Sequence, residues 1–354
     1  MNWQTEIKES TNIQKNKTAL MSKIYNWAIL GCGKIAKKFS SDLKLLPNTK
    51  LYATASRDLK KAQNFASEFG FEKSYGSYAE MLADEKVDVV YVATPHSYHH
   101  QHTLMCLEKK KAVLCEKAFA INKIEAREMV DAARKNNAFL MEAFWTMFQP
   151  SYKKAMKILQ SGELGKLKVV RSEFAFNGVF DPNNRLYNLK LGAGSLLDIG
   201  VYPVFAALTA LGKPKTIKTF ADFSSTGSEE SISAIFKYKG GEMASLTSSF
   251  AAYSPIQTEY WCENGYMILN PKWFAPTDIQ VWKNGEDVVI HKSEHGEGTG
   301  YQYEAAHVME CLDAGKIESD RMTWQLSLDL MEVLDRIRID AGIFFPEHDK
   351  NLFF

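Results

Sequence analysis

Residues 27–36 read WAILGCGKIA, an apolar run that leads directly into a glycine turn. The spacing of the turn is Gly31-x-Gly33-x-x-Ala36, and a helical pattern follows it. Gly31 permits a tight turn, Gly33 lets the backbone approach a bound group, and the small Ala36 lets the helix pack closely on the strand. This order of strand, turn and helix predicts a dinucleotide site, in which pyrophosphate meets the free N–H groups of the helix N-terminus.

Strands and helices alternate outward from this turn, between about residues 25 and 144. Residues 87–93 read VDVVYVA, a continuous β-branched run that is typical of a strand covered on both faces. Helices are predicted over 59–69 and 123–136, where apolar residues recur on one face. Repeated βα units of this length predict a parallel, doubly wound sheet, that is, a Rossmann domain.

The pattern changes after Trp145. An apolar helix is predicted over 195–211, and strands are predicted over 168–176, 232–238, 242–250, 258–262, 266–269, 279–282 and 288–291. The pairs Asn264-Gly265 and Asn284-Gly285 are typical of tight hairpins. We therefore predict an α+β second half with a large, open and mostly antiparallel sheet. The expected division is an N-terminal extension over 1–22, a dinucleotide-binding domain over 23–144, and a domain for substrate binding and dimerisation over 145–354.

Composition narrows the class of protein. The 354 residues are 45% hydrophobic and 24% charged, which is typical of a soluble globular chain and not of a disordered or fibrous one. Lys and Arg number 43 against 42 Asp and Glu, so the chain lacks the positive excess that nucleic-acid binding usually requires. No uninterrupted apolar run approaches the roughly 18 residues of a membrane span. We expect neither nucleic acid nor a membrane as a partner.

The five cysteines are scattered and form no C-x-x-C pair, which argues against a disulfide framework or a thiolate zinc site. A reducing cytoplasm is the expected location. Residues 1–20 are polar and have no apolar core segment, so they do not read as a secretory signal.

The end of the second predicted strand, Ala55-Ser56-Arg57-Asp58, bears on the choice of cofactor. A carboxylate placed first in this position would bind the ribose 2′-hydroxyl of NAD. Here Ser56 and Arg57 come first, and a guanidinium can pair with the 2′-phosphate of NADP. We predict NADP, with NAD as the open alternative. In the alternative interpretation Arg57 is a solvated loop residue and Asp58 caps the next helix.

Four later stretches carry a resemblance to a known family: VYVATPHSYHHQHT, CEKAFAINKIEA, MEAFWTMFQP and GAGSLLDIGVYPV. With the glycine turn, they resemble the glucose-fructose oxidoreductase, inositol dehydrogenase and rhizopine catabolism (Gfo/Idh/MocA) family. The motifs DIGVY and EAFWT are most similar to those of its dimeric dihydrodiol dehydrogenase branch. Members of that branch also act as NADP-linked D-xylose dehydrogenases. The resemblance implies a Rossmann domain followed by an α/β domain whose open sheet forms a homodimer.

The resemblance also implies an active site. Lys117 matches the family's active-site lysine, although Ala118 replaces the usual proline. Asp198 and Tyr202 are four residues apart, on one face of the predicted helix, and this branch carries tyrosine where other members have histidine. We expect Tyr202 to exchange a proton with substrate, Lys117 to lower the pKa of Tyr202, and Asp198 to orient a hydroxyl or Lys117. The plainer alternatives are a surface lysine and a core tyrosine.

Further residues complete the predicted site. Trp145 matches an active-site tryptophan and is expected in the substrate wall, while Met147 stands where related sequences carry arginine. The four histidines between His96 and His102 could hold a transition metal, but the resemblance places this loop beside nicotinamide, and we predict no metal. The expected cofactor contacts are Gly31, Cys32, Gly33, Lys34, Ile35, Ala36, Ser56, Arg57, Thr94, Pro95, His96, His99, Glu116 and Lys117.

These features predict an NADP-dependent oxidoreductase that transfers hydride between nicotinamide and a secondary alcohol or sugar carbon, with a dihydrodiol or an aldose such as xylose as substrate. The alternative is a non-catalytic, NADP-binding regulatory protein of the same family. The presence of both Lys117 and Tyr202 favours the enzyme.

Overall fold

Six parallel strands near the N-terminus form the first sheet of the computed structural model, which describes residues 23–350. The strand order is β3-β2-β1-β4-β5-β6, so the chain reverses direction across the sheet between β1 and β4. This is the doubly wound order in which ligands bind at the carboxyl ends of the strands, and it confirms the predicted Rossmann fold. The strands are β1 (Tyr25–Leu30), β2 (Thr49–Ala55), β3 (Lys73–Tyr75), β4 (Val89–Val92), β5 (Ala112–Glu116) and β6 (Leu140–Ala143). The extension predicted over 1–22 lies outside the described residues.

Helices flank this sheet and bury its central strands. All of β4 and β5 is buried, as the continuous apolar runs predict. The helices are α2 (Lys34–Leu43), α3 (Leu59–Phe69), α4 (Tyr78–Ala83), α5 (His99–Glu108) and α6 (Lys123–Asn136).

The second sheet has eight strands in the order β14-β13-β12-β11-β7-β10-β9-β8. Only the β7–β10 pair is parallel among its strand pairs in the described chain, so the predicted mostly antiparallel sheet is confirmed. The strands are β7 (Leu167–Ala175), β8 (Thr216–Phe223), β9 (Glu229–Lys237), β10 (Met243–Ser249), β11 (Thr258–Cys262), β12 (Gly265–Leu269), β13 (Ile279–Lys283) and β14 (Val289–His291). The predicted hairpin between β11 and β12 is present, but its turn residues are Glu263 and Asn264, one residue earlier than predicted, and Gly265 already belongs to β12.

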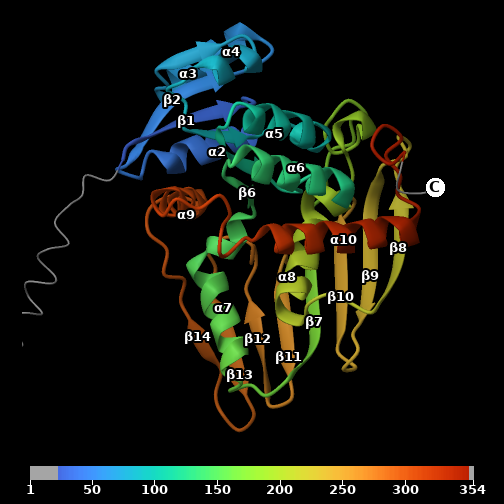
Figure 1. Ribbon diagram of the computed structural model, residues 1–354. Helices are drawn as coiled ribbons and strands as arrows, with labels where there is room; N and C mark the ends of the chain where they lie inside the picture. Colours follow the sequence, from blue (N-terminus) through green and yellow to red (C-terminus); the bar gives the residue numbers. More distant parts are fainter. Residues whose placement is uncertain (1–22, 351–354) are drawn as a thin grey trace, which may run out of the picture.

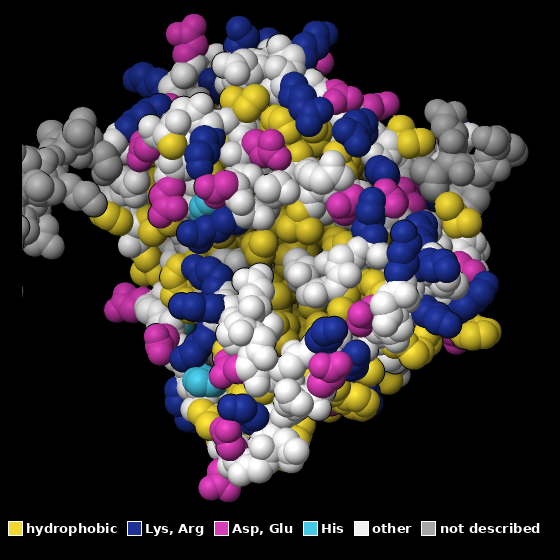
Figure 2. Space-filling view, turned by 60° about the horizontal axis from the view of Figure 1, so that its bottom comes forward, with side chains coloured by type: hydrophobic (Ala, Val, Ile, Leu, Met, Phe, Trp, Pro, Cys, Tyr) yellow, Lys and Arg dark blue, Asp and Glu magenta, His cyan; other side chains and the backbone are white. Residues whose placement is uncertain are grey.

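Helices cover one face of the second sheet, where α7 (Pro150–Ser161), α8 (Val201–Leu211) and α10 (Trp324–Ala341) pack (Figure 1). Side chains that point away from these helices stay exposed, and several are large and apolar: Phe220, Ile235, Met243 and Trp261. On the face shown in Figure 2, side chains of Lys and Arg are interspersed with those of Asp and Glu around a hollowed apolar area. Such mixing agrees with the nearly balanced charge of the chain.

The last two helices join the sheets to each other. Helix α9 (Tyr301–Asp313) begins against α2, where the Asp42 carboxylate accepts hydrogen bonds from the main-chain N–H groups of Thr299, Gly300 and Tyr301. Helix α10 packs on both α6 and β8. The Arg338 guanidinium is fully buried, pairs with the Asp335 and Asp349 carboxylates, and donates to the main-chain oxygen of Ile121, just before α6. The junction between the sheets is therefore tied by buried charge and not by apolar contact alone.

One segment departs from the prediction that no apolar stretch is long enough for a membrane span. Leu189–Leu211 is long and apolar enough to cross a bilayer by length and composition. Its most apolar window is 94% buried inside the protein, however, against β7, β10 and α10. The segment is a buried part of the core that packs on the second sheet.

Candidate active site

The glycine turn has the geometry that a dinucleotide requires. Gly31 has a positive φ of +103°, and a Cβ there would lie 2.9 Å from the Ala93 carbonyl oxygen at the end of β4. Helix α2 starts at Gly33, and no side chain in the described structure caps it, nor does an acidic residue occupy its first turn. Its first N–H groups are therefore free to bind pyrophosphate oxygens. These features fit the predicted cofactor.

The residues between the glycines contribute main chain rather than side chains. The Cys32 thiol points inward, 3.1 Å from the Thr54 hydroxyl, and the Ala36 side chain is buried against the sheet. Lys34 is exposed and Ile35 half-buried at the first turn of α2. Among these four residues, only Lys34 has a charged side chain that could bind a phosphate.

After β2, the side chains of Asp58 and Arg57 have different partners. The Asp58 carboxylate accepts a hydrogen bond from the Lys61 N–H group at 3.2 Å and caps α3, which confirms that alternative for Asp58. Arg57 is exposed, and its guanidinium carbon lies 5.7 Å from the centre of the Tyr98 ring. Ser56 is buried, and its hydroxyl accepts from the Asp58 N–H group. The guanidinium is thus the side chain left to meet a ribose substituent, as NADP requires.

Lys117 and Asp198 meet between the two sheets, although 81 residues separate them in the chain. Lys117 directly follows β5, and its Nζ donates to the main-chain oxygen of Asp198 at 2.5 Å and lies 3.4 Å from Oδ1. Both side chains are almost fully buried. Burial opposes ionisation of Asp198, but the cations of Lys117 and Arg185 outweigh it and hold the pKa of the carboxyl well below its usual range.

Arg185 is the functional residue that the sequence analysis missed. Its guanidinium donates to Asp198 Oδ1 at 2.9 Å from a loop that carries no motif, and its side chain stays more than half exposed. A buried carboxylate is costly without a partner, so Asp198 on an apolar helix was itself the signal that further cations were needed. Together these groups form a triad of two cations and one anion, in which Lys117 and Asp198 are almost fully buried and Arg185 is partly exposed.

Tyr202 lies beside this triad. Lys117 Nζ is 5.1 Å from the centre of the Tyr202 ring, and the Tyr202 oxygen accepts a hydrogen bond from Trp145 Nε1 at 3.0 Å. Trp145 begins the 3₁₀ turn Trp145–Phe148 and stacks on Tyr301, with ring centres 4.2 Å apart. Tyr301 was not predicted, because nothing in the sequence connects the start of α9 to this site.

The expectation that Lys117 lowers the pKa of Tyr202 is wrong for this structure. Burial raises the pKa of Tyr202 well above its usual value, the Glu116 carboxyl adds to that, and the Trp145 hydrogen bond opposes it only in part. The physical reason is that Lys117 points its ammonium at Asp198, over the ring of Tyr202 and not at its oxygen. The phenol is therefore protonated at neutral pH and suited to donate a proton.

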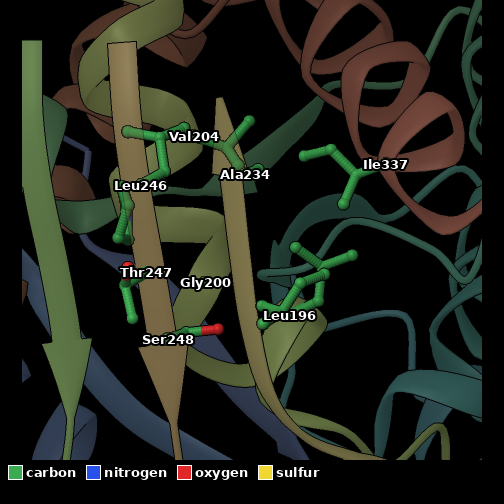
Figure 3. A pocket seen from close by; sticks show the side chains of 10 residues that line it. Leu196, Gly200, Val204, Ala234, Leu246, Thr247, Ser248 and Ile337 are labelled. Carbon is green, nitrogen blue, oxygen red and sulfur yellow. The ribbon is translucent and has the colours of Figure 1, made fainter. Parts of the chain in front are cut away.

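A tight turn places Asp198 and Tyr202. The predicted helix over 195–211 is in fact a π-helical turn, Leu196–Gly200, followed by α8. A Cβ at Gly200 would lie 2.7 Å from the Ser248 hydroxyl on β10, so only glycine allows this approach. Behind the turn is a small, mostly apolar cavity of about 10 Å³, closed on its far side by Ile337 (Figure 3). The turn is therefore held by close packing, and π turns often occur at functional sites.

The histidine loop is a scaffold. His99 is buried, and its two ring nitrogens lie 2.8 Å from the carbonyl oxygens of Ala118 and Thr94. His96 Nδ1 faces the Gly192 carbonyl oxygen at 3.0 Å, and burial lowers the pKa of His96 to about 3. His102 bonds Thr94, and His100 pairs with Glu128. The four imidazoles contact different atoms of Ala118, Thr94, Gly192 and Glu128 and do not converge on one metal position. His99 positions Ala118, the residue next to Lys117.

The remaining predicted contacts surround Lys117. Glu116 is buried, its Oε1 accepts from the Tyr91 hydroxyl, and its Oε2 accepts from the Lys117 N–H group at 3.2 Å. Burial raises the pKa of Glu116. Pro95 starts the 3₁₀ turn His96–Tyr98 at the carboxyl end of β4. These residues hold the main chain on each side of Lys117.

Two family models match the chain. The model described as an oxidoreductase family with an NAD-binding Rossmann fold, Gfo/Idh/MocA, matches residues 25–144. The model described as the Gfo/Idh/MocA C-terminal domain matches residues 152–268.

Curated proteins and solved structures are also similar. The trans-1,2-dihydrobenzene-1,2-diol dehydrogenase of Xenopus laevis is 38% identical over 330 residues, covering 90% of this chain and 99% of that protein. The protein of the same name from Mus musculus is 37% identical over 334 residues, covering 92% and 99%. A 3-ketoreductase of Actinomadura kijaniata, crystallised with NADP, superimposes with a TM-score of 0.82 at 23% identity over 90% of this chain and 98% of its own. This last likeness shows the fold.

Proposed function

The chain belongs to the Gfo/Idh/MocA oxidoreductase family, and from this premise we propose that it uses NADP to interconvert a hydroxyl and a carbonyl on a vicinal diol or a sugar. It is an NAD(P)-dependent oxidoreductase that acts on CH–OH groups. The observation that carries the proposal is the convergence of Lys117, Asp198 and Tyr202 beyond the carboxyl ends of β4 and β5, on the side of the glycine turn. The dihydrodiol named for its relatives supplies the proposed substrate class.

NADP, when bound, accepts or supplies the hydride, and the protein supplies position and charge. In the reducing direction, the protonated Tyr202 hydroxyl gives its proton to the carbonyl oxygen as that oxygen gains negative charge. The Trp145 N–H group, which donates to the phenol oxygen, stabilises the charge that the tyrosine then carries. In the oxidising direction Tyr202 first releases its proton to solvent, and the phenolate oxygen then takes the proton of the substrate hydroxyl.

Lys117 is proposed to donate to the same substrate oxygen. Its ammonium sits over the Tyr202 ring, so both groups face one small volume. The Asp198 carboxylate fixes the ammonium, and Arg185 donates to the same carboxylate oxygen, Oδ1. Asp198 and Arg185 are therefore positioning residues for Lys117. Trp145, stacked on Tyr301, is proposed as part of the substrate wall.

The regulatory alternative needs the cofactor site but no proton donor. A regulator has no need of a buried lysine and aspartate beside a tyrosine, because burying an ion pair has a desolvation cost that binding NADP alone does not require. This argument favours the enzyme.

A substrate screen tests the proposed function. Purified protein is mixed with NADP or NAD and a set of trans-diols and aldoses that includes D-xylose, and the absorbance of the reduced cofactor is followed. We expect turnover with at least one diol or aldose, and faster with NADP. Tight NADPH binding without turnover of any substrate in either direction would support the regulatory alternative instead.

Arg57→Asp should reverse the cofactor preference. It replaces a guanidinium beside the 2′-phosphate site with a carboxylate, which repels that phosphate and can bind a 2′-hydroxyl. Because hydrogen bonds to charged groups contribute about 1.5–3 kcal/mol, we expect NADPH to bind about 10- to 100-fold more weakly and NADH to change little. Fluorescence titration measures both affinities. Arg127→Asp, an exposed change on α6, is the control. An equal loss for both cofactors would show that Arg57 does not bind the phosphate.

The open face of the second sheet is proposed as the surface of a homodimer. Large apolar side chains such as Ile235 and Trp261 stay exposed there, and an exposed apolar sheet face of this size is typical of an interface. We expect a dimer in sedimentation velocity and, for Ile235→Lys, a dissociation constant raised by more than about tenfold, since the new charge would be buried without a partner. Ile339→Lys changes an equally exposed isoleucine on α10 and should leave the dimer intact. A monomeric wild-type protein would contradict this proposal.

A further inference from the structure

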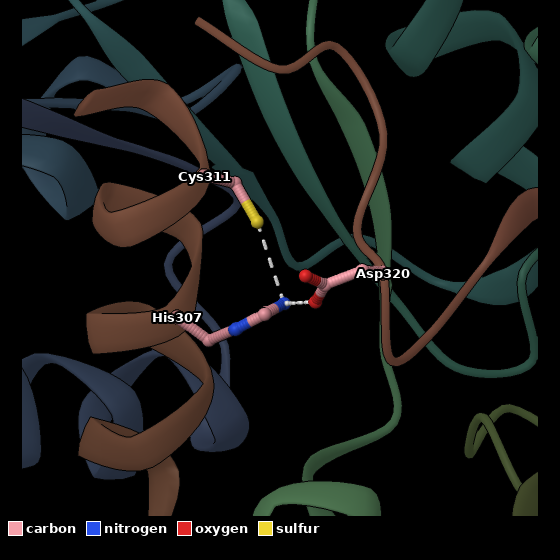
Figure 4. Close-up of side chains that lie close together, drawn as sticks. All are labelled: His307, Cys311 and Asp320. Atoms are coloured by element: carbon pink, nitrogen blue, oxygen red, sulfur yellow. Dashed lines mark hydrogen bonds and ion pairs between the residues drawn. The ribbon is translucent and has the colours of Figure 1, made fainter. Parts of the chain in front are cut away.

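A second group of chemically reactive side chains lies at the far end of α9, away from Lys117 and Tyr202. His307 and Cys311 are one helical turn apart on α9, and Asp320 faces them from the loop that leads to α10 (Figure 4). Cys311 Sγ lies 3.4 Å from His307 Nε2, and Asp320 Oδ1 lies 3.6 Å from the same nitrogen. None of these residues takes part in the proposed reaction.

The hydrogen bonds around His307 decide which ring nitrogen carries the proton. The Ser319 hydroxyl oxygen accepts from the N–H groups of Arg321 and Met322, so its own proton points to His307 Nε2, 2.8 Å away. Nε2 therefore carries the lone pair, which accepts the Ser319 proton in this structure, and the ring proton is on Nδ1.

This arrangement leaves acceptors facing each other. The unprotonated His307 Nε2 and the Asp320 Oδ1 are 3.6 Å apart with no proton between them, and the Cys311 thiol completes the group. A cation between these atoms would turn a repulsive contact into an attractive one. Bond lengths of about 2.0–2.3 Å to tetrahedral zinc place neighbouring N, O and S ligands roughly 3.3–3.6 Å apart, close to the two distances observed.

The residues that contact His307 and Asp320 resemble those that support the ligands of a metal site. Glu310 Oε2 lies 3.5 Å from His307 Nδ1, the nitrogen that would not bind the metal, as in carboxylate–histidine–zinc sites. Lys316 Nζ holds Asp320 Oδ2 at 2.7 Å and leaves Oδ1 directed at His307. His307 and Cys311 are buried, whereas Asp320 is exposed, so the fourth position opens to water.

We propose that His307, Cys311 and Asp320 bind a divalent transition metal ion of borderline softness, with Zn²⁺ as the best match. Nitrogen, thiolate and carboxylate together suit Zn²⁺ better than Mg²⁺ or Ca²⁺, which prefer oxygen alone. On binding, the Cys311 thiol releases its proton to solvent and the Ser319 hydroxyl gives up its bond to Nε2. Cysteine spacing alone does not indicate this site, because the ligand pair is His-x-x-x-Cys on a helix and not two cysteines.

The metal would fix the position of the loop between Cys311 and Asp320. Between Cys311 and Asp320 the chain runs along the edge of the first sheet, where the Leu140 N–H group on β6 donates to the Ile317 carbonyl at 3.1 Å and Glu318 pairs with Leu140. Binding would fix this added edge segment to the end of α9. The expected role is therefore structural, and it is independent of the proposed catalytic reaction.

Co²⁺ titration of the chelator-treated, reduced protein tests the site directly. Co²⁺ bound to a thiolate gives a near-ultraviolet charge-transfer band, which Zn²⁺ should abolish by displacement. Loss of an outer contact typically weakens metal binding 10- to 100-fold, so we expect Cys311→Ser to remove the band and raise the Zn²⁺ dissociation constant by more than about 100-fold. Cys262→Ser changes the one cysteine of the described chain that is not buried, and it should leave the band unchanged.

Asp320→Asn keeps the proposal testable if Cys311→Ser does not fold. Asp320 is exposed, so this variant should fold, yet bind Zn²⁺ at least about tenfold more weakly and lose most of the increase in melting temperature that Zn²⁺ gives the wild type. Asp131→Asn, an exposed change on α6, should keep that increase. Absence of a thiolate band in the wild type, or a band that survives in Cys311→Ser, overturns the proposal.

Discussion

Tyr202→Phe should lower kcat by about 10²–10⁴-fold while NADPH affinity stays within a fewfold of wild type, because general acid–base catalysis typically contributes that factor. Only the phenol oxygen is removed, and the ring keeps its packing against Phe144 and Trp273. The fold should survive, but the buried Trp145 N–H group loses its acceptor, so we expect the variant to be less stable by about 1–3 kcal/mol. Steady-state kinetics on the substrate found in the screen, with a thermal melt, measure both effects.

Two control variants separate proton transfer from structure. Tyr152→Phe removes the hydroxyl of another buried tyrosine, one that bonds the Thr209 hydroxyl, and should leave kcat nearly unchanged. Trp145→Phe removes the same indole–phenol hydrogen bond from the other side. If Tyr202 serves only to hold Trp145, this variant should lose as much kcat as Tyr202→Phe. Near-wild-type kcat for Tyr202→Phe itself would rule out the tyrosine as proton donor.

Local signals explain how much of the fold was predictable. The helices Leu59–Phe69 and Lys123–Asn136 match the predicted ranges because each has a side-chain cap at its start, Asp58 or Asn122, and a left-handed residue at its end. Strand β8 was missed. The strand lies at the edge of the sheet and pairs only with β9. Its Phe220 is 84% exposed, so the apolar residues of β8 do not mark the positions that are buried inside this chain.

The site was predictable where a motif carries the residue and not where three-dimensional contact creates the role. Lys117, Asp198 and Tyr202 lie in recognisable stretches and do come together. Arg185 and Tyr301 lie in stretches without a motif, and only folding brings them to Asp198 and Trp145. The pKa of Tyr202 was predicted in the wrong direction because it depends on burial and on where the Lys117 ammonium points, neither of which the sequence states.

Lys117→Met should reduce kcat to a similar degree, about 10²–10⁴-fold, because it removes the cation proposed to bind the substrate oxygen. Methionine fills nearly the same volume, and Arg185 still neutralises the Asp198 carboxylate, so this buried charge keeps a partner. The melting temperature should therefore fall only modestly. Lys213→Met removes a lysine from a surface ion pair with Asp329 and should leave kcat unchanged.

The double variant Tyr202→Phe, Lys117→Met distinguishes a joint role from two separate ones. If both groups act on one substrate oxygen, removing the second costs little once the first is gone, and the double variant should be at most a fewfold slower than the slower single variant. Losses that multiply would mean that the two residues act independently. In that case Lys117 would hold Asp198 and the π turn in place, and a matching loss in Arg185→Met, which removes the other cation on Asp198, would identify that positioning role.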